Sequence, residues 1–302
     1  MEFESIEDVM KRLEKAGYIA SREIATVVFL AAAGNKPILV EGPAGSGKTE
    51  LARALSTCMN RHKIRLQCYE GLDEAKALYE WEYAKQLLYT QMIKEKINDL
   101  ISGADTIADA VERIADQEDA FFSERFLLAR PLLQAISADD PTVLLIDEID
   151  KADPEFEAFL LELLSEFQVS IPELGIRKAK HIPMVVLTSN NYRDMSDALK
   201  RRCLHLYIDY PEPALEAKII RLKLPGIETR LADKMIAVIN RIRELDLKKR
   251  PCISETIDWA QALAVLRIDE ITREAMSDTI NVICKYRSDA DMVKASMDRI
   301  LN

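Results

Sequence analysis

The sequence predicts an α/β protein, with a parallel five-stranded sheet flanked by helices and followed by a small all-helical domain. Up to about residue 210, short apolar runs alternate with stretches of helical spacing, which is the pattern of a parallel sheet covered by helices. Beyond residue 210 we find helical spacing and no convincing strand. One example of this spacing is the series Leu231, Met235, Val238, Ile242 and Leu245.

Five short apolar runs bounded by turn residues are the predicted strands of the sheet. They cover residues 37–41, 64–68, 143–146, 184–188 and 204–208. The segment Tyr210–Pro213 then breaks the chain with two prolines. We therefore expect one domain over residues 1–210 and a second, all-helical domain over residues 211–302.

Helices are predicted between these strands. Ser5, with Asp8 three residues later, is a helix start, and residues 21–33 and 48–60 follow as helices. After Pro154 an apolar stripe recurs with a period of 3.6 residues. It consists of Phe156, Phe159, Leu160, Leu163, Leu164 and Phe167.

Two further segments carry predictions of their own. Residues 73–137 have one glycine and no proline before Pro131, which predicts several helices, including a helical insertion at about 73–120. Residues 168–182 predict a β-hairpin that turns at Gly175. Tyr79, Trp81 and Tyr83 are expected to pack locally rather than to grip a client protein.

The composition is that of a globular protein. The 302 residues include 41 Lys and Arg against 51 Asp and Glu, a formal net charge of −10, and 48% of them are hydrophobic. The longest uncharged apolar stretch, residues 25–33, is about half of the roughly 18 residues that a membrane helix needs. The first residues are acidic where a signal peptide would be basic. We expect a cytoplasmic protein without membrane insertion, and the overall acidity argues against nonspecific binding to nucleic acid.

The cysteines and histidines predict neither a disulfide framework nor a metal cage. The three histidines are scattered, and the cysteines are far apart with no C-x-x-C pair, so we expect reduced and mostly buried thiols. The cysteines are Cys58, Cys68, Cys203, Cys252 and Cys284.

The strongest motif is G-x-x-x-x-G-K-[ST], which lies between a predicted buried strand and a predicted helix. Its residues are Gly42, Pro43, Ala44, Gly45, Ser46, Gly47, Lys48 and Thr49. Backbone N–H groups of such a loop surround a β-phosphate, and the helix that follows points its positive dipole end at the same anion. Lys48 would reach the β- and γ-phosphates of ATP, and Thr49 would bind Mg²⁺.

Acidic and polar residues follow two of the predicted strands. Asp147 and Glu148 come directly after the third strand, at the sheet edge where phosphates bind in such folds. Asp147 would hold Mg²⁺, and Glu148 would deprotonate the attacking water, which favours hydrolysis over transfer. Asn190 follows the fourth strand and would contact the γ-phosphate or the water, although an Asn after a strand is more often a turn or cap residue.

Arg201 and Arg202 stand at the end of a short predicted helix. Cations at this position complement the helix dipole. Alternatively, one of them is an arginine finger, which places a guanidinium on the γ-phosphate and accelerates hydrolysis by about 10³ to 10⁵. A finger supplied by a neighbouring subunit would make hydrolysis depend on assembly.

Together, these motifs and the helical tail resemble an AAA+ ATPase over nearly the whole chain. More narrowly, the chain is similar to the MoxR group and to its CoxD-like branch, whose members are associated with maturation of a molybdenum-containing carbon monoxide dehydrogenase. The residues that carry this narrower resemblance are 66–73, 77–81, 167–173 and 201–208.

The resemblance implies a homo-oligomeric ring, usually hexameric, with ATP and Mg²⁺ at each subunit boundary and a partner that carries a von Willebrand A domain. Lys48 and Thr49 correspond to Walker A, Asp147 and Glu148 to Walker B, and Asn190 to sensor 1. Arg202 is the first candidate for the finger and Arg201 its competitor. The helical domain would be a lid over the nucleotide.

One position departs from the family pattern. Relatives often place an arginine, sensor 2, at the start of a lid helix, whereas this chain presents Glu255 there. Either Lys249 or Arg250 has taken over the role, or the lid senses the γ-phosphate weakly. The sequence leaves both alternatives open.

Three functions compete at this stage. The leading hypothesis is a chaperone-like motor that remodels a client protein or its metal centre. A nucleic-acid motor or loader is the second, based on the basic residues Arg177, Lys178 and Lys180 and on the run 248–250. The third is a small-molecule kinase, against which Glu148 and the arginine pair at 201 and 202 argue.

Overall fold

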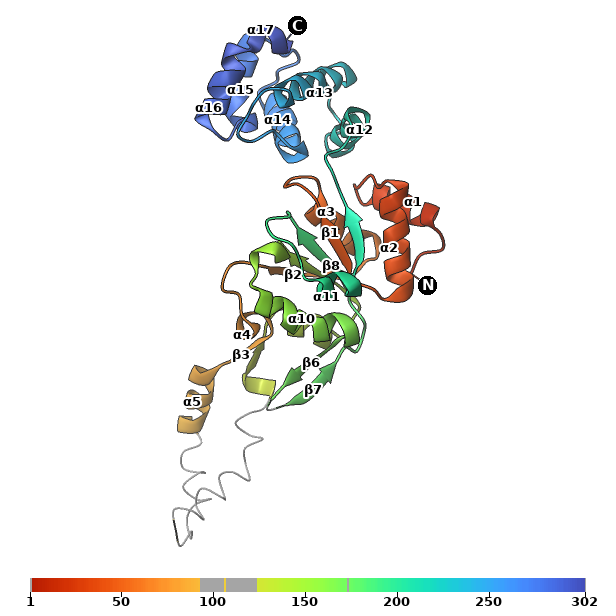
Figure 1. Cartoon of the computed structure of the whole chain (residues 1–302), viewed down its shortest axis with the longest axis vertical. Coiled ribbons are helices and arrows are strands. Elements are labelled where there is room, and N and C mark those ends of the chain that lie inside the picture. Colours follow the sequence, from red (N-terminus) through yellow and green to blue (C-terminus); the bar gives the residue numbers. More distant parts are fainter. Residues whose placement is uncertain (1, 93–105, 107–123, 173, 302) are drawn as a thin grey trace.

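The computed structural model describes residues 2–92, 106, 124–172 and 174–301 (Figure 1). Its centre is a five-stranded sheet with the strand order β2-β5-β8-β1-β9, in which all neighbouring strands are parallel. This confirms the predicted fold class. The strands are β1 (Ile38–Glu41), β2 (His62–Gln67), β5 (Thr142–Asp147), β8 (Met184–Ser189) and β9 (Leu204–Tyr207).

The middle strands β5 and β8 are buried along their whole length, because helices cover both faces of the sheet. Their side chains alternate between two cores. Leu144 and Ile146 belong to one core, and Val143 and Leu145 to the other. The uninterrupted apolar composition of these strands is therefore a consequence of burial on both sides.

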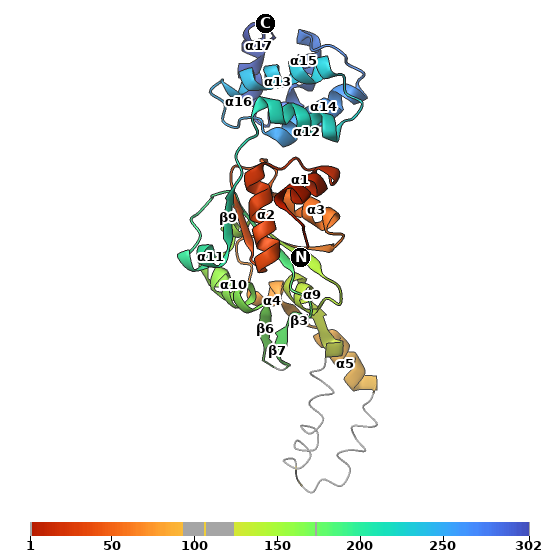
Figure 2. The same cartoon turned by 90° about the vertical axis from the view of Figure 1, so that its right-hand side faces the viewer.

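One face of the sheet is covered by α1 (Ile6–Lys15), α2 (Arg22–Gly34) and α3 (Lys48–Cys58), which pack together in Figure 2. Ser5 and Ser21 cap the first two helices, since their hydroxyls accept hydrogen bonds from the backbone N–H groups of Asp8 and Ile24. Helix α3 begins directly at the glycine-rich loop and has no side-chain cap.

The other face is covered by α9 (Pro131–Ser137), α10 (Pro154–Glu166) and α11 (Asp197–Arg202). Proline starts both α9 and α10, where its missing N–H costs no intrahelical bond. The predicted stripe of α10 faces this core, with Phe156, Leu160, Leu163 and Leu164 buried.

All described elements after β9 are helices. They pack around a third core, in which Trp259 is fully buried and donates a hydrogen bond of 2.8 Å to Thr279 Oγ1. The division into two domains near residue 210 stays a prediction. The helices are α12 (Pro213–Lys223), α13 (Thr229–Arg243), α14 (Ile253–Val265), α15 (Arg273–Ile283), α16 (Arg287–Ala295) and α17 (Met297–Leu301).

The prediction of helices over residues 73–137 is wrong in part, because the segment also contains strands. Between α4 (Glu74–Ala77) and α5 (Tyr83–Met92) lies the strand β3 (Tyr79–Trp81), which pairs antiparallel with β4 (Leu127–Ala129). Residues two apart share one face of a strand, so the rings of Tyr79 and Trp81 meet edge to face at 6.0 Å. Most of the insertion predicted at 73–120 lies outside the described residues.

An antiparallel pair is present at the predicted hairpin. It consists of β6 (Gln168–Ile171) and β7 (Gly175–Lys178), and Gly175 has a φ of 75°.

In the described ranges, no helix combines the length and the apolar character that crossing a membrane requires.

Truncation of a buried side chain in the inner strand β5 tests this packing. Leu144 is fully buried, so Leu144→Ala should lower the free energy of unfolding by about 2–5 kcal/mol. The matched control is Leu30→Ala, since Leu30 is 52% exposed, and its effect should stay within about 0.5 kcal/mol. Chemical denaturation followed by circular dichroism measures both, and equal losses in the two variants would contradict the core assignment.

Candidate functional site

The parallel register gathers polar residues at one edge of the sheet. Gln67 of β2 is paired with Asp147 of β5, and Glu41 of β1 with Ser189 of β8. All four residues end their strands. This carboxyl edge is where parallel α/β sheets bind ligands.

The loop between β1 and α3 requires its glycines. Gly42, Gly45 and Gly47 have φ values of 148°, 77° and 98°, which side-chain-bearing residues rarely adopt. A Cβ atom on Gly42 would lie 2.0 Å from the carbonyl oxygen of Ile208, and one on Gly45 would lie 2.0 Å from Cys252 Sγ. The loop is thus held tightly between β9 and the start of α14, with the N-terminus of α3 open to an anion.

Lys48 lies at the start of α3 and is only 5% exposed. Its Nζ donates hydrogen bonds to the carbonyl oxygens of Gly42 at 2.8 Å and of Pro43 at 2.7 Å. Burial lowers the pKa of Lys48, and nearby carboxylates, that of Asp150 most strongly, act in the opposite direction. The ammonium group therefore lies folded against the loop whose ligand it is expected to bind.

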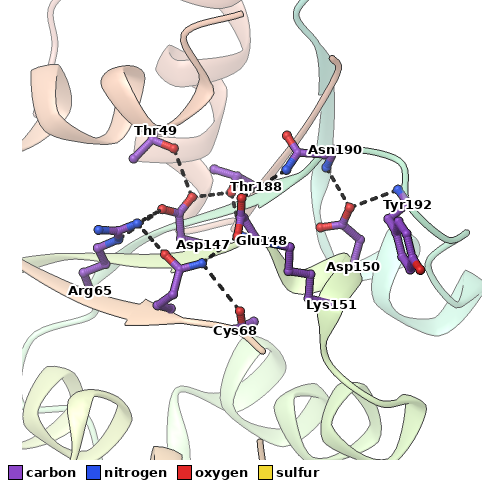
Figure 3. A network of polar contacts seen from close by, with 11 residues as sticks. Thr49, Arg65, Cys68, Asp147, Glu148, Asp150, Lys151, Thr188, Asn190 and Tyr192 are labelled. Atoms are coloured by element: carbon purple, nitrogen blue, oxygen red, sulfur yellow. Dashed lines mark hydrogen bonds and ion pairs between the residues drawn. The ribbon is translucent and has the colours of Figure 1, made fainter. Parts of the chain in front are cut away.

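Asp147 connects three segments (Figure 3). Its Oδ1 accepts hydrogen bonds from Thr49 Oγ1 at 3.0 Å and from Thr188 Oγ1 at 2.6 Å. Its Oδ2 accepts from Arg65, with Nη2 at 2.5 Å and Nε at 3.0 Å. Hydroxyl and carboxylate oxygens are the ligands that Mg²⁺ prefers, so Thr49 and Asp147 fit a magnesium ion beside the phosphate loop.

Glu148 has its carboxylate engaged on both oxygens. Oε2 accepts from Gln67 Nε2 at 2.8 Å and lies 2.6 Å from Lys151 Nζ, while Oε1 accepts from Asn190 Nδ2 at 3.3 Å. Its backbone has a φ of 57° and its N–H donates to Thr188 Oγ1 at 2.9 Å. The predicted base and the predicted sensor therefore lie in hydrogen-bond contact.

These groups line a cavity of about 340 Å³. Its wall combines the glycine-rich loop and the sheet edge with Ser254, which comes from α14. The helical region thus contributes directly to the site. The lining residues are Ala44, Gly45, Gly47, Lys48, Thr49, Glu50, Arg53, Lys63, Asp147, Glu148, Thr188, Asn190 and Ser254.

The start of α14 shows what Glu255 does. Its Oε2 accepts the backbone N–H of Cys252 at 3.1 Å, and its Oε1 lies 2.8 Å from Lys249 Nζ. Although burial raises the pKa of Glu255, hydrogen bonds from Cys252 and Lys249 hold it below its ordinary value overall. Glu255 thus caps the helix and pairs with a cation.

A second link joins the helical region to the phosphate loop. Glu50, two residues after Lys48, forms ion pairs with Arg53 of its own helix and with Lys223 of α12. Burial raises the pKa of Glu50, but these two cations lower it below its ordinary value overall. In addition, Tyr210 Oη lies 3.5 Å from the carbonyl oxygen of Ala44.

The structure does not bring Arg201 or Arg202 to the cavity of their own chain. Arg202 donates to Ser165 Oγ at 2.5 Å and to the carbonyl oxygen of Ala198 at 3.0 Å. Arg201 is exposed and has no polar partner in the part of the chain that is described. Lys48, Thr49, Asp147, Glu148 and Asn190, in contrast, all meet at one place.

Sequence reasoning missed several residues of this site. Arg65 and Gln67 contact the acidic pair from β2, and Lys151 contacts it from the turn that follows β5. The sequence shows that residues 65 and 67 share one face of a strand. It does not show that β2 is the neighbour of β5, since strand order follows from tertiary packing.

The cysteines supply no reactive thiolate. Burial raises the pKa of Cys68 and of Cys203 to about 12, and those of Cys58 and Cys284 to about 11. These thiols therefore stay protonated at neutral pH, which makes them poor nucleophiles.

The chain is similar to several known proteins. A family model described as an AAA domain of the dynein-related subfamily matches residues 37–203, more than half of the chain. Uncharacterized proteins of Staphylococcus haemolyticus and Staphylococcus saprophyticus are each 25% identical over 259 residues, covering 82% of this chain and 85% of theirs. One of Staphylococcus epidermidis is 26% identical over the same coverage.

Among solved structures, the RuvB Holliday junction branch migration motor of Thermotoga maritima is 16% identical, with a TM-score of 0.47. The match covers 92% of this chain and 71% of that structure. A mutant form of RuvB is 17% identical, with a TM-score of 0.48 and the same coverage.

Proposed function

The chain belongs to the dynein-related subfamily of AAA domains, and on this basis we propose that it binds ATP with Mg²⁺ and hydrolyses it to ADP and phosphate. The observation that carries this proposal is the convergence of the glycine-rich loop, Asp147, Glu148 and Asn190 on one cavity. These groups are distant in sequence and meet only at the carboxyl edge of the sheet.

Each group has a distinct role. The N–H groups of the loop and the N-terminus of α3 hold the β-phosphate, and Lys48 turns from the loop carbonyls towards the β- and γ-phosphates. Thr49 and Asp147 hold Mg²⁺, which neutralises charge on the phosphates when bound. Asn190 orients the attacking water beside Glu148.

Glu148 accepts the proton of that water, a function worth about 10² to 10⁴ in rate. In the present conformation Gln67 and Lys151 occupy its Oε2. Oε1 is bonded among the described residues only to Asn190 Nδ2, at 3.3 Å, so it is the oxygen that accepts the proton. The base thus acts directly beside the residue that orients the water.

The arginine finger is proposed to come from a neighbouring subunit. Neither Arg201 nor Arg202 lines the cavity of its own chain, which supports action across a subunit boundary. Arg201 is the exposed one, and Arg202 is held by Ser165 and Ala198. This arrangement favours a ring, for which we propose six subunits from the family resemblance.

The proposed work of this ring is remodelling of a protein client, including the metal centre of a molybdenum enzyme, with a von Willebrand A domain protein as partner. The support is the resemblance of residues 66–73 and 167–173 to the MoxR group. A nucleic-acid motor is the alternative, but Lys180 of the basic hairpin region lies 2.7 Å from Asp139 and is already paired.

The first experiment separates binding from hydrolysis. Lys48→Ala should weaken binding of a fluorescent ATP analogue, because it removes the cation at the phosphates. Glu148→Gln should retain that affinity and reduce phosphate release by about 10²-fold or more, since it removes only the base. Equal loss of affinity in both variants would contradict the role of Glu148.

The second experiment assigns the finger. Arg202→Ala and Arg201→Ala are compared with Lys200→Ala, a control on the same helix. The finger variant should bind ATP normally and lose about 10³-fold in turnover, and adding Lys48→Ala subunits, whose fingers are intact, should restore it. Failure of rescue in both arginine variants, with rings still formed, would indicate that no finger acts across the boundary.

The third experiment identifies the client. The Glu148→Gln protein is isolated from its native cells in ATP and Mg²⁺, and bound material is analysed by mass spectrometry and nucleic-acid staining. We expect a von Willebrand A domain protein or a molybdenum hydroxylase subunit. Recovery of nucleic acid without such proteins would replace the remodelling proposal by the nucleic-acid motor.

A further inference from the structure

Asp150 is a buried carboxylate that the proposed reaction does not use. It lies in the short 3-10 turn η2 (Ile149–Lys151) and is 1% exposed. Its Oδ2 accepts two backbone hydrogen bonds, from Asn190 N at 2.9 Å and from Tyr192 N at 3.0 Å (Figure 3). Its Oδ1 is buried without a hydrogen-bond partner among the described residues.

The two hydrogen bonds enclose a backbone turn that needs support. Between the two donors lies Asn191, whose φ of 59° is in the left-handed region that few non-glycine residues adopt. Such a conformation persists where surrounding contacts fix it. Asp150 supplies two of these contacts, and Ser189 Oγ, which accepts the N–H of Asn191 at 3.1 Å, supplies another.

This turn determines where the side chain of Asn190 lies. Asn190 Nδ2 is 3.3 Å from Glu148 Oε1, near the long end of the range for such hydrogen bonds. A small displacement of the backbone would break the contact. Because Glu148 and Asp150 are two residues apart, the carboxylate that fixes Asn190 is anchored to the same turn as the base.

The other described hydrogen bonds near this turn hold the backbone of Asn190 less directly than Asp150 does. The hydrogen bonds of Thr188 Oγ1 with Glu148 N and with Asp147 Oδ1 lie before the end of β8, and neither contacts the backbone of residues 190–192. Asp150 is the described side chain that binds the backbone of Asn190 itself.

We propose that Asp150 is a positioning residue, which holds Asn190 at a fixed offset from Glu148 so that both act on the same water. This inference rests on the proposed ATP hydrolysis. What it adds is that the acceptor position of Asp150, rather than its negative charge, supports turnover. Asparagine at this position keeps an acceptor in place, whereas glutamate keeps the charge and moves the acceptor outward.

The test compares Asp150→Asn with Asp150→Glu. We expect Asp150→Asn to retain kcat within about threefold, and Asp150→Glu to lose about 10- to 100-fold in kcat, as displacements of about 1 Å do. Affinity for ATP should change little in Asp150→Glu, which keeps the negative charge that acts on Lys48. The control is Asp194→Glu, an exposed carboxylate further along the same loop, which should match the wild type.

A double substitution provides the second readout. In an Asn190→Ala background, Asp150→Glu should cause no further loss of kcat, because the residue it positions is gone. Additive losses would overturn the proposal, as would loss of kcat in Asp150→Asn equal to that in Asp150→Glu. Parallel losses of ATP affinity and thermal stability would assign Asp150 a merely structural role. Absence of ATP hydrolysis in the wild type would instead refute the proposed function.

Discussion

The hydrogen bonds to the Asp147 carboxylate are the interaction on which the site depends. They join the helix after the phosphate loop through Thr49, the edge strand β2 through Arg65 and the central strand β8 through Thr188. Asp147 is almost completely buried, and a buried carboxylate is stable only when such donors surround it. The same donors that stabilise the charge therefore fix the relative positions of the three segments.

The next residue, Glu148, is constrained by contacts to its own carboxylate. Its carboxylate is bound by an amide and an ammonium group from the same chain, and the arginine pair on α11 lies away from the cavity. If the chain hydrolyses ATP as proposed, an arginine finger has to come from a neighbouring subunit, and assembly would then control turnover.

The helical region is coupled to the loop by direct contacts. Cys252 lies against Gly45, Ser254 lines the cavity, and Lys223 pairs with Glu50, the residue after Thr49. A movement of α12 or α14 would therefore displace the glycine-rich loop.

The sequence by itself determined the strands of the sheet, the glycine-rich loop and the acidic pair that follows the third predicted strand, because these depend on local spacing and on residues adjacent in the chain. It failed at Tyr79–Trp81, where pairing with a distant strand overrides local helical preference. Only the tertiary structure decided that β2 lies beside β5, that Gln67 therefore reaches Glu148, and that Asp150 holds the turn after β8. Such contacts join residues about 40 to 80 positions apart, and strand order and register, which create them, follow from packing of the whole chain.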